Sequence, residues 1–308
     1  MCVLTRGRAY FTYFDSRYLL RGIALIASLR EVGDQSQVIV VALDEDVERF
    51  FRAVPVAGVT LITLPEIESA DLDLAAIKST RSRVEYYFTL TSAIADFIMK
   101  LIPESSNYWL CYLDSDLLFF SNPDKVFSDH AYANILLTPH EFSLKLEHLA
   151  EYGQFNVGFI GWRTNAIGRQ CVSDYRDRCI EWCFDRVEDG KFADQKYLDT
   201  WPQQYNGVVV LSGVPINVSY WNIGSFELTS EGGFLLLNGE KLIAWHFSGL
   251  VTRDHWDYSL SHCADEITSC PEVISKVYAP YVYKLRSIRE VAAEVIGFPG
   301  AASLVRLR

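Results

Sequence analysis

The chain has 308 residues, half of them hydrophobic and 14% aromatic, which is ample for a large core. Its 28 basic and 39 acidic residues give a net charge of −11, a balance that argues against nucleic acid as a partner. No window approaches about 18 uninterrupted apolar residues, and the N-terminus lacks a signal-peptide pattern. We therefore expect a cytoplasmic protein.

The cysteines indicate neither zinc nor disulfide chemistry. There are seven, scattered without a CxxC pair, a pattern that predicts reduced thiols. Cys179 and Cys183 are one helical turn apart beside Trp182, and we interpret them as packing residues.

Strands and helices alternate in the first half of the chain. Apolar patterning predicts strands over residues 9–14, 37–43 and 59–64 and helices over residues 18–29 and 84–102. This β-α-β order predicts an α/β fold with a mainly parallel, Rossmann-like central sheet flanked by helices. Ligands of such sheets bind at the carboxyl ends of the strands.

Shorter elements follow in the second half. The predicted strands and helices are strands 132–137, 155–162, 208–211, 234–237 and 242–247 and helices 166–186 and 194–201. No repeat or linker interrupts them, so we expect one catalytic domain over residues 1–270. Residues 271–308 are expected to form a helical tail. Its basic and apolar residues fit either an anionic membrane surface or a helix packed on the body.

The segment 112–120, YLDSDLLFF, is the most informative part of the chain. The apolar run 109–113 fits a strand buried on both faces, and it ends in Asp114 and Asp116. Burying two like charges this close is costly unless a cation or strong hydrogen bonds compensate. Magnesium or manganese would take the carboxylate oxygens and keep positions open for phosphate. The alternative is a strand-end turn whose acids face water.

Among the six histidines, His246 in WHFSG is the best candidate for a third metal ligand. It follows the strand pattern 242–245 and precedes Ser248-Gly249, so its imidazole is expected at a strand end. A lone histidine is more often structural. Together with two carboxylates, however, it completes a donor set suited to an octahedral ion.

Four motifs occur in a set order: DSD at 114–116, FNVGFIGW at 155–162, Asp194-Gln195, and HFSG at 246–249. In this order the chain resembles glycosyltransferase family 8 and its relatives in the nucleotide-diphospho-sugar transferase superfamily, over roughly residues 9–260. The resemblance implies a GT-A fold and transfer of a hexose-type sugar from a nucleotide diphosphate sugar, with retention of anomeric configuration. A uridine nucleotide is the implied donor.

The resemblance also implies roles for individual residues. Asp114, Asp116 and His246 would bind manganese or magnesium, and the ion would hold the diphosphate. The residues implied around the nucleotide are Thr12, Tyr13, Asp15, Tyr18 and Ser115. The residues implied at the sugars are Asn156 and Gly158 in the sugar or acceptor pocket, Asp194 at the donor-sugar hydroxyls, and Gln195 near the reacting carbon.

The chain departs from the family pattern at several positions, which predicts a divergent branch. The family often has a lysine after HxxG, whereas this chain has HFSGLVTRDHW, so a cation that faces the phosphate would be Arg253 or come from elsewhere in the chain. Bulky Tyr13 and Phe14 replace small residues of the first strand. Arg81 and Arg83 either reach the diphosphate or are solvated charges at a helix start.

The segment NVSYWNIG suggests a further site loop. Trp221 and Asn222, with Asn217 nearby, suit sugar recognition by stacking and hydrogen bonding. Tryptophan is also simply a large core residue, so both interpretations stay open. A glycan or lipid-linked acceptor, as in polysaccharide biosynthesis, is expected from the aromatic content and the basic tail. That tail would allow peripheral contact with the inner face of a membrane.

Two other functions compete with sugar transfer. In a haloacid dehalogenase-type phosphatase the first Asp of a DxD is phosphorylated. Here Leu117 and Leu118 follow the second Asp where a Thr or Val is expected, and no convincing later acidic pair completes the motif. A nucleotide-sugar binding protein without transfer activity would keep the same pocket. Donor hydrolysis without acceptor separates this last function from an enzyme.

Overall fold

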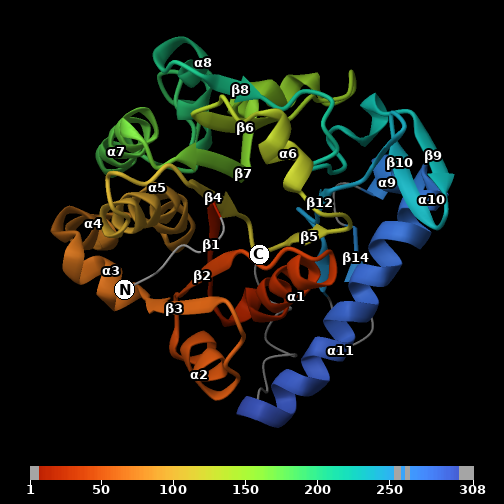
Figure 1. Ribbon diagram of the computed structural model, residues 1–308, viewed down its shortest axis with the longest axis horizontal. Helices are drawn as coiled ribbons and strands as arrows, with labels where there is room; N and C mark the ends of the chain where they lie inside the picture. Colours follow the sequence, from red (N-terminus) through yellow and green to blue (C-terminus); the bar gives the residue numbers. More distant parts are fainter. Residues whose placement is uncertain (1–6, 253–257, 261–263, 298–308) are drawn as a thin grey trace.

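A seven-stranded sheet forms the centre of the computed structural model, which describes residues 7–252, 258–260 and 264–297 (Figure 1). In spatial order its strands are β3 (Val59–Thr63), β2 (Gln37–Ala42), β1 (Arg8–Phe14), β4 (Trp109–Leu113), β7 (Phe155–Arg163), β6 (Ile135–Pro139) and β8 (Val208–Val210). Neighbouring strands are parallel except where β7 pairs with β4 and β6. The predicted α/β fold with a mainly parallel sheet is confirmed.

Helices cover both faces of this sheet (Figure 1). One face carries α1 (Leu19–Glu31) and α2 (Glu45–Ala53), and α11 (Ala279–Ile296) packs against these two helices. The other carries α3 (Leu64–Ala70), α4 (Leu72–Ile77), α5 (Arg83–Leu101) and α7 (Ala166–Glu181). Successive strand residues alternate between the two cores: Tyr10 and Val38 lie in the first, and Phe11 and Ile39 in the second. This alternation follows from the two-residue repeat of a strand.

A short strand pair extends beyond the acidic end of β4. β5 (Leu117–Phe119) pairs antiparallel with β12 (Ala244–His246), which places His246 opposite Leu117. A separate small sheet contains β9 (Leu228–Glu231), β10 (Phe234–Leu237) and β11 (Glu240–Lys241). The β5–β12 pairing brings residue 246 beside the turn at residues 114–116.

Some predicted elements differ from the structure. The helix predicted over 166–186 ends at Glu181, where Trp182 turns to extended backbone. The helix predicted over 194–201 is a 3₁₀ turn (Gln195–Thr200) followed by α8 (Trp201–Gln204). Pro202 tolerates only the first turn of a helix, because it lacks an N–H and its ring clashes with the preceding turn. Four short helices have no counterpart among the predicted elements: α2, α3, α4 and α6 (Asp124–Asp129), all nine residues or fewer.

The described part of the C-terminal segment is helical from residue 271 to residue 296, and residues 298–308 of the predicted tail lie outside the described residues. α10 (Pro271–Val273) and a π-helical turn (Ile274–Tyr278) lead into α11, which packs against α1 and α2 (Figure 1). Tyr281 is fully buried, and its ring stacks on Phe247 with centroids 3.7 Å apart. Of the two expectations for this tail, a helix packed on the body describes residues 279–296. None of the helices in the described ranges is long and apolar enough to cross a membrane.

Candidate metal centre and active site

The two acids lie in a tight turn at the carboxyl end of β4. The backbone N–H of Asp114 donates to the carbonyl of Gly158 at 2.9 Å, and the N–H of Leu117 donates back to the Asp114 carbonyl at 3.1 Å. Tyr112 Oη donates to Asp114 Oδ1 at 2.6 Å. These bonds hold the Asp114 carboxylate at the sheet edge where ligands of such folds bind.

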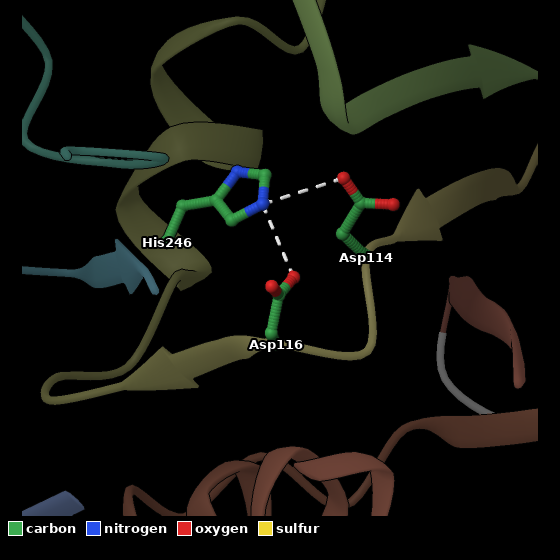
Figure 2. A group of neighbouring side chains, drawn as sticks. All are labelled: Asp114, Asp116 and His246. Carbon is green, nitrogen blue, oxygen red and sulfur yellow. Dashed lines mark ion pairs between the residues drawn. The ribbon is translucent and has the colours of Figure 1, made fainter. Parts of the chain in front are cut away.

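His246 meets both acids (Figure 2). Its Nε2 lies 3.1 Å from Asp116 Oδ1 and 3.5 Å from Asp114 Oδ2. The backbone holds this arrangement, because the N–H of Phe247 donates to the Asp116 carbonyl at 3.0 Å. One possible ligand atom from each of the three side chains lies within 4.8 Å of the others. The predicted meeting of the histidine with the two acids is therefore confirmed.

The charges of this cluster are coupled. Burial raises the pKa of Asp114, an effect that His246 opposes and the neighbouring Asp116 reinforces. Burial also works to raise the pKa of Asp116, but His246 and Arg21 hold this pKa below its usual value. Burial disfavours the imidazolium of His246, yet the two carboxylates raise its pKa overall. Carboxylates this close together, with Asp116 buried and Asp114 partly buried, favour a cation between them.

The donor set fits a hard divalent ion. Two carboxylates and one imidazole nitrogen face a common point, and these are ligands that manganese and magnesium accept. Close approach of the backbone makes room for the ring. A Cβ added at Gly158 would lie 2.6 Å from His246 Nδ1 and 2.7 Å from Asn156 Oδ1. Only glycine fits at position 158 without a shift of these side chains.

Two adjoining cavities lie beside this cluster. The smaller, of about 420 Å³, is lined by Asp114, Asp116 and His246, together with aromatic side chains of β1 and α5. The larger, of about 830 Å³, extends toward the loops after β6 and α7. Asn156 and Ser248 line both. The two cavities therefore meet at Asn156 and Ser248, beside the cluster.

Four of the five residues expected at the nucleotide line the smaller cavity. They are Tyr13, Asp15, Tyr18 and Ser115. Thr12, the fifth, is fully buried in β1 and is not among the lining residues. Tyr13 Oη donates to the carbonyl of Tyr87 at 2.8 Å, and Tyr87 Oη donates to Asp15 Oδ2 at 3.0 Å. The start of α5 is thereby tied to the end of β1 along one wall of the cavity.

The predicted arginines lie elsewhere. Arg81 donates to the carbonyls of Cys183 at 2.7 Å and Ile180 at 2.8 Å, so its guanidinium binds carbonyl groups at the C-terminal end of α7. Arg81 is not among the residues that line the smaller cavity. Arg83 is an exposed residue at the start of α5. Arg253 lies outside the described residues. Diphosphate contact by these three remains a prediction.

An arginine that the sequence analysis did not select lies at the cluster. Arg21, on the first turn of α1, places Nη1 3.3 Å from Asp116 Oδ2. Arg17, next to Asp15, lines the smaller cavity. The available signal was helical spacing, since Arg21 follows Tyr18 by three residues and therefore shares its helix face.

Asp194 and Gln195 lie side by side but in different surroundings. Gln195 lines the larger cavity, and its Nε2 donates to the carbonyl of Tyr152 at 3.1 Å. Asp194 is buried and accepts from Tyr175 Oη at 3.1 Å. Burial raises the pKa of Asp194 to about 7 against the opposing hydrogen bond from Tyr175, with the charge of Asp114 contributing. A carboxyl group so placed changes charge near neutral pH.

The loop 217–222 supplies one wall of the larger cavity. Trp221 lines it and meets His246 edge-on, with ring centroids 5.3 Å apart. Asn222 instead accepts a bond from the backbone N–H of Ser219 at 2.9 Å and holds the loop. Asn156, the predicted sugar or acceptor ligand, lines both cavities, while Gly158 lies behind the histidine ring.

Comparison with known structures identifies the fold as the GT-A fold of glycosyltransferases. The galactosyltransferase LgtC, solved with donor and acceptor sugar analogues, aligns with a TM-score of 0.52 at 14% identity, covering 91% of this chain and 95% of LgtC. The glycosyltransferase GlyE of Streptococcus pneumoniae TIGR4 aligns with a TM-score of 0.51 at 15% identity, covering 94% of this chain and 64% of GlyE.

Sequence relatives are found in Bacillus subtilis (strain 168). The uncharacterized protein YfnD is 29% identical over 286 residues, which cover 90% of this chain and 88% of YfnD. The uncharacterized protein YfnF is 27% identical over 249 residues, covering 78% of this chain and 81% of YfnF. No family model matches the chain.

Proposed function

We propose that the protein is a metal-dependent glycosyltransferase that moves a hexose from a nucleotide diphosphate sugar, a UDP-sugar by resemblance, to a glycan or lipid-linked acceptor. One observation carries this proposal: the Asp114, Asp116 and His246 cluster lines the smaller of two adjoining cavities inside a GT-A fold. A donor in the smaller cavity would place its diphosphate at the cluster. An acceptor in the larger cavity would face the sugar.

The chemistry requires that charge on the leaving group be stabilised. Cleavage of the bond between the anomeric carbon and phosphate leaves negative charge on the nucleoside diphosphate, and stabilisation is most useful where that charge develops. A bound manganese or magnesium ion would supply positive charge at this position. Arg21, adjacent to Asp116, is the described cation nearest to help.

The chain's own residues have distinct proposed tasks. Tyr13 and Tyr18 offer aromatic walls for the base and ribose. Gln195, which lines the larger cavity, would lie near the reacting carbon. The neighbouring Asp194, whose carboxylate accepts from Tyr175, would bind hydroxyl groups of the donor sugar. Retention of configuration is proposed with no covalent nucleophile, because a same-face mechanism requires none. The proposed catalytic unit spans residues 1–270.

The proposal is tested by donor hydrolysis in manganese. Asp116→Asn keeps the side-chain volume but removes one charge from the cluster, so we expect loss of manganese-dependent release of nucleoside diphosphate. Asp129→Asn, at an exposed acid on α6, is the matched control and should behave as wild type. Both variants should unfold cooperatively. Wild-type turnover in Asp116→Asn would refute the metal role.

A thermal-shift screen of nucleotide sugars identifies the donor. Ligand binding stabilises the folded state by mass action, so the true donor should raise the melting temperature only when manganese is present. A protein that binds donor without transferring sugar would show this shift but no release of nucleoside diphosphate, with or without acceptor. That result would show that the protein binds a nucleotide sugar without transferring it.

A further inference from the structure

Behind the metal centre lies a chain of hydrogen bonds that connects the two cavities. It starts at the carbonyl of Gly153, which is 3.1 Å from His140 Nδ1. His140 Nε2 is 3.2 Å from Asn156 Nδ2. Asn217 Nδ2 donates to Asn156 Oδ1 at 2.9 Å. The chain ends where Asn217 Oδ1 lies 2.9 Å from His246 Nδ1.

The direction of each bond in this chain is set by its first member. A carbonyl can only accept, so His140 must carry its proton on Nδ1 and offer the lone pair of Nε2. That lone pair requires the NH₂ group of Asn156 and turns the Asn156 oxygen toward Asn217. Asn217 must then donate from Nδ2 and present its oxygen to His246 Nδ1.

Further contacts fix the same orientations independently. The backbone N–H of Gly158 donates to Asn156 Oδ1 at 2.8 Å, which identifies that atom as the oxygen. Asn217 Nδ2 also lies 2.8 Å from Thr138 Oγ1. Burial lowers the pKa of His140 to about 3, so its ring stays neutral, as the chain requires.

We infer that Asn217 is a positioning residue: by accepting the Nδ1 proton of His246, it fixes the tautomer in which Nε2 presents its lone pair to the metal. Histidine ligands generally donate their second nitrogen to such a partner, and loss of that partner lowers metal affinity by about 10- to 100-fold. This inference rests on the proposed metal centre. His140 and Asn156 would support the same tautomer of His246 by orienting the amide of Asn217.

The backbone at Asn217 supports a dedicated role. Its φ is +58°, in the left-handed region that asparagine tolerates better than other residues with side chains. The side chain is 1% exposed, so its amide serves only protein partners. Asn238 offers a comparison, because it has a φ of +52° in the turn between β10 and β11, away from the metal centre.

The test measures manganese binding to the protein without nucleotide, by titration calorimetry. Asn217→Ala should weaken binding by about 10- to 100-fold. Asn238→Ala, which imposes similar left-handed strain, should leave the affinity unchanged. Asn217→Asp retains an oxygen that can accept from His246 but loses the NH₂ group that donates to Asn156 and Thr138. It should therefore lose some manganese affinity but less than Asn217→Ala, since carboxylates are common partners of metal-bound histidine.

The Asn217→Asp variant separates positioning from packing. If Asn217 only filled space or held the loop, a buried carboxylate would be the more damaging substitution, and Asp would lose more affinity than Ala. Long-range nitrogen NMR of the His246 ring with magnesium bound gives a second readout. We expect a single tautomer protonated at Nδ1 in wild type and a mixture in Asn217→Ala.

The role of His140 in the hydrogen-bond chain is tested by the single variant His140→Phe and by the double variant His140→Phe with Asn217→Ala. His140→Phe should preserve the ring stacking with Phe142, whose centroid lies 4.4 Å away, but removes the acceptor that orients Asn156. We expect a smaller loss of manganese affinity than for Asn217→Ala. The two losses should not add, because both act through His246.

The outcomes are distinguishable from failure of the proposed function. If wild type binds no manganese, the proposed metal centre fails and this inference fails with it. If wild type binds manganese and Asn217→Ala binds it equally well, the metal centre stands and the positioning role of Asn217 is wrong. If the losses of manganese affinity add in the double variant, His140 does not act through His246, whereas the positioning role of Asn217 stands.

Discussion

Replacing Asp194 by asparagine should make the protein more stable while removing transfer activity. The reason is its pKa, which burial raises to about 7 from 3.8. In the unfolded chain Asp194 ionises near its ordinary pKa, whereas the folded protein keeps the proton until about pH 7. The folded state therefore binds more protons across this window, and stability contributed by this group falls as pH rises.

The size of the effect follows from the shift. About three pKa units at about 1.4 kcal/mol each give an upper limit of about 4 kcal/mol, fully expressed above about pH 7. Asparagine does not titrate, and its side-chain oxygen can still accept from Tyr175. We expect Asp194→Asn to gain about 2–4 kcal/mol over wild type at pH 8 and much less at pH 5.

Urea unfolding with a chelator present, at several pH values between about 5 and 8, provides the assay. Asp71→Asn is a control of opposite sign. Burial would raise the pKa of Asp71, but its bonds with Arg176 hold this pKa below the usual value, so that variant should lose stability at neutral pH. A stability difference between Asp194→Asn and wild type that stays constant from pH 5 to 8 would refute the buried-acid argument.

Three further predictions concern glycine packing, Arg81 and the C-terminal helix. Gly158→Ala should lower the free energy of unfolding by about 1–3 kcal/mol and weaken manganese binding. Gly161→Ala in the same strand should be tolerated, since its Cβ would have neighbours no closer than 3.4 Å. Equal losses of stability and manganese affinity in the two variants, measured by calorimetry, would contradict this prediction. Arg81→Ala should lose about 2–3 kcal/mol in urea unfolding with the donor KM unchanged, and a raised KM would restore its predicted diphosphate role. Tyr281→Ala should lose about 3 kcal/mol and the 73% exposed Tyr283→Ala almost nothing, whereas a loss of liposome binding without destabilisation would favour the membrane alternative for the tail.

Local patterning was sufficient to predict the framework of the site. The apolar run at residues 109–113 has the same bounds as β4, because a strand buried on both faces needs an uninterrupted apolar segment. The β-α-β order predicted the parallel part of the sheet, and with it the edge where Asp114 and Asp116 lie. The position of His246 at a strand end was equally visible.

Other features depended on contacts between distant segments. Whether Arg81 meets phosphate or the end of α7 depends on how α5 packs on α7, and its carbonyl partners lie about a hundred residues away along the chain. The burial of Tyr281 likewise depends on α11 crossing α1. Neither relation leaves a local pattern in the sequence.

The amino-acid sequence by itself determined most of the strands of the central sheet, their succession along the chain and the types of side chain at the sheet edge, because each depends on neighbours within a few residues. Only the tertiary structure decided what surrounds those side chains. The register of β5 with β12 brings residue 246 to the acids, and the packing of loop 217–222 against β7 places an amide behind its ring. The hydrogen bonds of Asn217 join residues between 29 and 79 positions apart along the chain, so they are fixed by three-dimensional packing alone.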